Sequence, residues 1–136
     1  MFTTCKNSKK QGDVGLGVAI GWFTTNHYTV AIPLTDSQDY DLIVDKDNAL
    51  KRVQVKTTSR LQNGMYQVEL RTLGGNQSWQ GVAKHFDNTN VELVFVLTAA
   101  GDKYLIPAAE VKCRSIMSLG KKYDKYKLGA DPHACL

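Results

Sequence analysis

Apolar side chains recur at intervals of three and four within residues 10–25, in the period of an α-helix. The pattern predicts a helix that ends at Asn26 and His27. Glycines in this segment lower its helix propensity by up to about 1 kcal/mol each relative to alanine, and we expect them to let the helix backbone approach a sheet closely. The apolar stripe consists of Val14, Val18, Ala19, Trp22 and Phe23.

Three segments that follow are rich in the β-branched and aromatic residues typical of strands: residues 28–33, 40–44 and 50–57. The Asp- and Asn-rich stretch 45–49 predicts a turn between the last two of them. Alternation in the third strand puts Val53 and Val55 on one face and Arg52, Gln54 and Lys56 on the other.

Asn63-Gly64 is typical of a hairpin turn, and it predicts a fourth strand over residues 65–73. We expect a short helix around 81–86, a buried strand over 91–98, a partner strand over 104–107 and one helical turn at 108–111. This order indicates an α/β fold with a central mixed β-sheet flanked by helices. We expect one domain over 1–136, with a core at about 8–112 and a basic C-terminal segment at 113–136.

The charge balance is mildly basic: 17 Lys and Arg against 13 Asp and Glu give a net charge of +4, which permits a polyanionic partner without requiring one. Lysines gather near both ends, and tyrosines accompany those near the C-terminus. Such interleaving suits phosphate contact with stacking or packing, and a solvated tail explains it equally well. The clusters are Lys6, Lys9 and Lys10, and Lys121, Lys122, Tyr123, Lys125, Tyr126 and Lys127.

Three cysteines, without a C-x-x-C pair, predict neither a disulfide framework nor a zinc site, and they favour a reducing cytoplasm. Residues 1–13 lack the apolar run of a signal peptide. No apolar stretch reaches the length of a membrane span, so we expect no membrane partner.

Gln54 and Lys56 lie two apart on a predicted strand, so they point the same way about 6 to 7 Å apart. Asp41 begins the preceding strand and approaches Gln54 if the two strands pair. A carboxylate and an amide oxygen suit Mg²⁺, which would polarise a phosphate and lower the pKa of an attacking water. Lys56 would hold that water or neutralise charge on the phosphate. The spacing alone is not specific, since an ordinary strand with a solvated polar face also explains it.

Four segments give the wider context: KKQGDVGLGVAI, YTVAIPLTDSQDYDLIVD, LKRVQVKTT and FDNTNVELVFVLTAAGDKYLIPAAEV. With these segments the chain resembles the PD-(D/E)XK nuclease superfamily, and most closely its group I intron-associated homing endonuclease branch. The resemblance covers about residues 8–112. It implies a restriction-endonuclease-like core in the order α-β-β-β-α-β.

The resemblance also implies a site. The family's metal-binding Asp falls on Asp41, its Glu or Gln on Gln54 and its Lys on Lys56, with Mg²⁺ or Mn²⁺ as the implied cofactor and double-stranded DNA as the substrate. Many relatives carry a Glu on the first helix after a Gly, where this chain has Leu16. Asp13, almost one turn earlier, is a candidate additional acid; a charge that interacts with the helix dipole is the alternative.

Lys9 and Lys10, at the start of the first helix, and Ser37 and Gln38, before the Asp41 strand, are candidate DNA contacts; solvated charge and a plain turn are the alternatives. The leading hypothesis is a site-specific double-strand DNA endonuclease of the homing type. Because two strands must be cut, we expect a homodimer or homotetramer. The alternatives are a structure-selective nuclease such as a Holliday junction resolvase, and a DNA-binding module that keeps the fold without cleaving.

Overall fold

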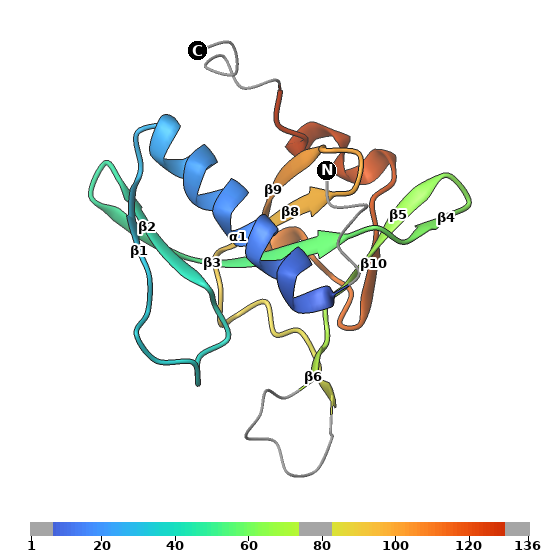
Figure 1. The fold of residues 1–136 in the computed structure, drawn as a ribbon, viewed down its shortest axis with the longest axis horizontal. Coiled ribbons are helices and arrows are strands. Elements are labelled where there is room, and N and C mark those ends of the chain that lie inside the picture. Colours follow the sequence, from blue (N-terminus) through green and yellow to red (C-terminus); the bar gives the residue numbers. More distant parts are fainter. Residues whose placement is uncertain (1–6, 74–82, 130–136) are drawn as a thin grey trace.

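The computed structural model describes residues 7–73 and 83–129. One α-helix, α1 (Ser8–Thr25), packs on a five-stranded sheet whose spatial order is β1-β2-β3-β8-β9 (Figure 1). β3 runs parallel to β8, and the other neighbouring pairs are antiparallel, so the predicted mixed sheet is confirmed. Its strands are β1 (Thr29–Ala31), β2 (Leu42–Lys46), β3 (Ala49–Thr58), β8 (Leu93–Thr98) and β9 (Lys103–Pro107).

Both faces of the sheet are covered around β8. On one face, Ala19 and Phe23 of α1 pack against Val53 and Phe95. On the other face, Val94 and Val96 belong to a second apolar cluster, together with residues from the later strands. Every residue of β8 is buried, because successive side chains enter opposite clusters. This explains the nearly unbroken apolar run of this strand.

The second apolar cluster is built without another α-helix in the part of the chain that is described. Its cover comes from β5 (Met65–Glu69), η1 (Ala108–Glu110), β10 (Ile116–Ser118) and η2 (Lys121–Tyr126), and the shorter strands are β4 (Leu61–Gln62), β6 (Thr72–Leu73) and β7 (Ala83–Lys84). The expected fourth strand over 65–73 is therefore split into β5 and β6. The expected helical turn near residue 108 is confirmed as η1.

The helix expected around 81–86 is wrong for residues 83–86, while 81 and 82 lie outside the described residues. β7 pairs with β6 as an antiparallel strand, and the N–H of Phe86 donates to the carbonyl of Arg114 (3.0 Å). Long-range pairing thus fixes this segment in an extended form. Such pairing depends on residues from 10 to 28 positions away, which a local periodicity does not encode.

The expected chain reversals are confirmed. α1 ends at Asn26, and His27 has a positive φ of 69°. Positive φ values also mark the β2–β3 turn and the β4–β5 turn, where Asn63 (53°) and Gly64 (76°) form a tight hairpin. None of the helices in the described part is long and apolar enough to cross a membrane.

The C-terminal lysine and tyrosine segment is packed rather than free. Tyr123 is buried in the second apolar cluster, and Tyr126 packs against that cluster. Lys122 and Lys125 lie over the rings of Tyr123 and Tyr126, each 5.2 Å from the ring centroid. Tyr123 is therefore unavailable to stack on a base, and the tyrosines of this segment serve packing.

Gly15 marks the closest approach of α1 to the sheet. A Cβ added there would lie 2.3 Å from Cγ2 of Thr57, whereas Gly17 and Gly21 have nothing within 4 Å. The expectation that the helix glycines allow close approach is therefore right for Gly15 and wrong for Gly12, Gly17 and Gly21.

We predict that Gly15→Ala lowers the free energy of unfolding by about 1 to 3 kcal/mol, because the new methyl group overlaps the Thr57 side chain and pushes α1 away from β3. Gly17→Ala is the matched control, and its better helix propensity should raise stability by up to about 1 kcal/mol. Urea unfolding of both variants measures this. Equal effects of the two substitutions would contradict the packing described for Gly15.

Candidate active site

Asp41 occupies the place where β2 would continue along β3. Its N–H donates to the carbonyl of Val53 (2.8 Å), and its Oδ2 accepts a hydrogen bond from the N–H of Val55 (2.7 Å). These two bonds bracket Gln54. The register of the strands, with Leu42 opposite Val53, also places Asp41 opposite Gln54 when it is extended by one residue.

The bond to Val55 fixes where the carboxylate lies. Strand N–H groups point along the sheet, towards the neighbouring strand, so a carboxylate that accepts one lies at the sheet edge rather than over either face. No described residue donates a hydrogen bond to Oδ1 of Asp41. The second oxygen is therefore available to a ligand at this edge.

Gln54 is nearly buried, with 7% of its surface exposed, and its Oε1 has no hydrogen-bond partner. Its side chain lies on the face of β3 opposite α1, where it lines a cavity of about 10 Å³, roughly the room for one water. The polar face of β3 thus meets the second apolar cluster at this point, not solvent. An unpaired buried amide oxygen is costly, and a bound cation or water would satisfy it.

Lys56 follows Gln54 on the same face of β3 and is only half-buried. Burial lowers the pKa of its ammonium below the ordinary lysine value, while the carboxylates of Asp41 and Glu69 act in the opposite direction. For Asp41, burial raises the carboxyl pKa, and the Val55 N–H and the Lys56 ammonium oppose this rise. Asp41 stays exposed on one side, so its desolvation is partial. The structure thus places Asp41 opposite Gln54 on neighbouring strands and within electrostatic range of Lys56, while Asp41 lines the groove beside α1 and Gln54 lines the cavity on the other face.

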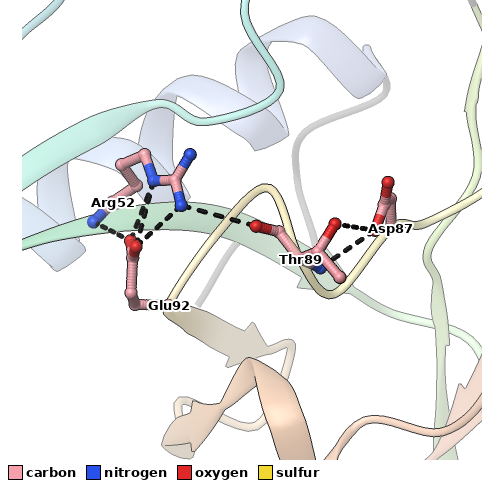
Figure 2. Close-up of polar contacts among 4 residues, drawn as sticks. All are labelled: Arg52, Asp87, Thr89 and Glu92. Carbon is pink, nitrogen blue, oxygen red and sulfur yellow. Dashed lines mark hydrogen bonds and ion pairs between the residues drawn. The ribbon is translucent and has the colours of Figure 1, made fainter.

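A polar clamp fixes the loop that forms one wall of the Gln54 cavity (Figure 2). The guanidinium of Arg52 binds Glu92, with an Nη2–Oε1 distance of 2.7 Å, and also donates to the carbonyl of Thr89 (3.4 Å). Asp87, which lines the cavity, accepts hydrogen bonds from the N–H and the hydroxyl of Thr89. The segment between Asp87 and Glu92 is thereby held against the start of β3.

The first turns of α1 face Asp41 across a groove. Lys9, Asp13 and Leu16 line this groove together with Asp41 and Val55. Leu16 therefore lies where a helix acid would face Asp41, and Asp13 is in the same groove. Within residues 7–73 and 83–129, no three His, Cys, Asp or Glu side chains are grouped to hold a metal ion. Asp41 would therefore supply most of the negative charge that balances a bound cation.

The candidate DNA contacts are only partly related to this groove. Lys9 lines it, and Lys10 is exposed on the same turn of α1. Ser37 is exposed in the loop before Asp41. The Gln38 amide instead closes its own loop, because it accepts from the Thr35 hydroxyl (3.1 Å) and donates to the Thr35 carbonyl.

Two acidic residues of the site were not foreseen from the sequence. Asp39 lines the Gln54 cavity and is held by the Lys84 ammonium (2.6 Å) and the Asn90 amide (2.8 Å). Glu69 acts on Lys56 from β5. Asp39 precedes the Asp41 strand by two residues, which was a weak local signal; Glu69 reaches Lys56 only through the packing of β5 beside β3.

Comparisons with known proteins identify the family and the fold. The chain belongs to the PD-(D/E)XK endonuclease family, whose sequence profile matches residues 6–126. It is similar to Protein 5.3 of Escherichia phage T7, with 29% identity over 106 residues that span 78% of this chain and 85% of that protein. Its fold is similar to that of the bacterial homing endonuclease I-Ssp6803I, with a TM-score of 0.69 over 89% of this chain and 86% of that one, at 22% identity. The family and the α/β fold expected from the sequence are thus confirmed.

We predict that Gln54→Met raises the free energy of unfolding by about 1 kcal/mol, because it replaces an unpaired buried amide with an apolar side chain of similar length. Gln67 is the matched control: it is also buried, but its amide accepts from Ser118 (2.6 Å) and donates to Met65 (3.3 Å). Gln67→Met should therefore lower stability by about 1 to 2 kcal/mol. Thermal and urea unfolding measure both effects, and a loss of stability in Gln54→Met would refute the functional interpretation of its unpaired oxygen.

Proposed function

We propose that the protein is a site-specific double-strand DNA endonuclease of the homing type that uses Mg²⁺ or Mn²⁺. The observation that carries the proposal is the carboxylate of Asp41 at the end of β2, opposite the strand position of Gln54, whose buried Oε1 is unpaired. Family membership supports a DNA-cleaving activity. The fold shared with a bacterial homing endonuclease supports the homing type.

The residues present suit a hard divalent cation. Asp41 supplies an anionic oxygen and Gln54 a neutral one, which are ligand types that Mg²⁺ accepts alongside several waters. When bound, such a cation polarises the scissile phosphate and lowers the pKa of a water. Because Leu16 occupies the helix position where a carboxylate could face Asp41, Asp41 is the one carboxylate assigned to the cation. Phosphate oxygens of the DNA would complete the set of ligands.

Lys56 acts on the reacting phosphate in this proposal. Hydrolysis forms a bond between phosphorus and a water oxygen and breaks the bond to the leaving oxygen, which takes up a proton. The partly desolvated ammonium of Lys56 neutralises the charge that grows on the phosphate or holds the attacking water. The apolar environment that lowers its pKa also strengthens its interaction with the phosphate.

One chain offers one such centre, whereas two strands must be cut. We therefore propose a homodimer or a homotetramer, in which symmetry supplies a pair of centres. The single-domain organisation over 1–136, with Lys9, Lys10, Ser37 and Gln38 near the DNA, belongs to the same proposal. Asp13 shares the groove of Asp41 and is the proposed additional acid.

A second candidate is a DNA-binding module that does not cleave. It is favoured by Leu16, which puts an apolar side chain in the groove where a carboxylate would strengthen cation binding. This candidate differs from the first in one measurable respect: binding would be tight and dependent on salt concentration, without strand cleavage in any divalent ion.

We predict that the protein cuts duplex DNA carrying its target site in Mg²⁺ or Mn²⁺, and that chelation abolishes cutting. Lys56→Met should reduce the single-turnover rate by about 100-fold or more, because it removes the charge that stabilises the transition state. Lys51→Met is the matched control, since Lys51 is an exposed lysine on the same strand. Its cutting rate should stay within a few-fold of wild type.

Three other results would distinguish between the candidate functions. Binding without cutting across several divalent ions would establish the non-cleaving module. A preference for four-way junctions over linear duplex would indicate a junction resolvase. Undiminished cutting by Lys56→Met would overturn the active site described above.

A further inference from the structure

The β4–β5 hairpin follows β3, the strand that carries Gln54 and Lys56, and projects away from the core (Figure 1). β5 pairs with β4 and is also joined to the end of β3, because Thr58 donates its hydroxyl to the carbonyl of Gln67. β10 supports the other side of β5. In the described part of the chain, β4 is an edge strand, so one long side of the hairpin is open to solvent.

The hairpin carries side chains that suit base recognition, from Arg60 at its base to Asn63 at its turn. Arg60, Gln62 and Asn63 are all exposed, and within the described residues none of the three side chains makes a hydrogen bond or ion pair. The pairing of β4 with β5 extends to Arg60, whose carbonyl accepts from the N–H of Gln67 (2.9 Å). Alternation therefore puts Arg60 and Gln62 on one face of the hairpin.

These residue types have defined partners in the major groove of DNA. Arg pairs with the O6 and N7 atoms of guanine through two hydrogen bonds, and Asn or Gln pairs with the N6 and N7 atoms of adenine. The groove is wide enough to admit a two-stranded ribbon. The hairpin carries no acidic side chain between residues 59 and 67 that would oppose the approach of phosphates.

We propose that the β4–β5 hairpin enters the major groove and reads base edges with Arg60, Gln62 and Asn63. The proposal rests on the proposed function, because it assumes a DNA duplex at the candidate active site. It assigns sequence recognition to a surface distinct from Asp41, Gln54 and Lys56. A separate reading surface would give the chain specificity without altering its hydrolytic residues.

The distance along the chain sets which base pairs are read. Arg60 and Asn63 follow Lys56 by four and seven residues, so they lie at most about 13 and 23 Å from it along an extended chain. At about 3.4 Å per base pair, these distances correspond to roughly four to seven base pairs of duplex. The hairpin should therefore read bases within about seven pairs of the phosphate next to Lys56.

Selection of bound duplexes from a randomised library, in Ca²⁺ to support binding, tests the proposal directly. Wild type should enrich defined bases in a short block. Arg60→Ala should lose preference at one position, with about 10- to 100-fold less discrimination against the wrong base. Gln62→Ala and Asn63→Gly should each relax a neighbouring position, and glycine preserves the positive φ of residue 63.

Two further variants separate reading from charge and from folding. Arg60→Lys keeps the charge but not the planar fork, so it should retain the salt dependence of binding and lose the base preference. Lys51→Ala, at the opposite end of β3, removes one positive charge and should leave the preference unchanged. Because these side chains are exposed, the melting temperatures should match wild type.

Each outcome of these experiments either supports or overturns base recognition by the hairpin. Weaker binding by Arg60→Ala with an unchanged base profile would show contact with phosphates only, and it would overturn the proposal. An absence of base enrichment by wild type would also overturn it. Loss of preference in the hairpin variants, together with no cleavage by wild type in any divalent ion, would support the hairpin while refuting the endonuclease. Cleavage with a preference that ignores the hairpin would do the reverse.

Discussion

The hydrogen bond from the Val55 N–H to the Asp41 carboxylate is the interaction on which the site depends. It occurs where β2 stops pairing with β3, so a side-chain oxygen takes the place of a backbone carbonyl in the ladder. The bond keeps the carboxylate in the plane of the sheet, beside Gln54. It also opposes the rise in pKa that partial burial imposes on Asp41. This bond thus fixes the position of the carboxylate and favours its charged form.

β3 connects this site to the rest of the molecule. Its odd-numbered residues pack under α1, close to Gly15, and its even-numbered residues place Gln54 and Lys56 on the opposite face. The parallel partner β8 is buried on both sides and fixes β3 in the middle of the sheet. Beyond Thr58 the chain continues into the hairpin. β3 therefore contributes both to the packing of the core and to the proposed chemistry. It also leads directly into the hairpin that is proposed to recognise bases.

The sequence predicted those elements whose signals are local. The helix over residues 10–25, the alternation of Val53 and Val55 with Gln54 and Lys56, and the Asn63-Gly64 turn all follow from short-range periodicity or turn chemistry. Contacts between distant parts of the chain could not be predicted in this way. β7 is extended because it pairs with β6, and Glu69 acts on Lys56 because β5 lies beside β3. The cavity at Gln54 likewise depends on residues from 39 to 91. The expected pairing of strands 40–44 and 50–57 is present and puts Asp41 opposite Gln54, but nothing local indicated that the Gln54 amide would be buried and unpaired.

The central claim is that Asp41 and Gln54 share one cation at the sheet edge. Crystals of the protein bound to duplex DNA, soaked in Mn²⁺, test it most directly, because the DNA phosphates are present and the ion can be located by its anomalous scattering. We expect one peak at about 2.1 Å from a carboxylate oxygen of Asp41 and a similar distance from Oε1 of Gln54. A peak held by Asp41 and Asp13 with Gln54 still unpaired, or no peak at either residue, would contradict it.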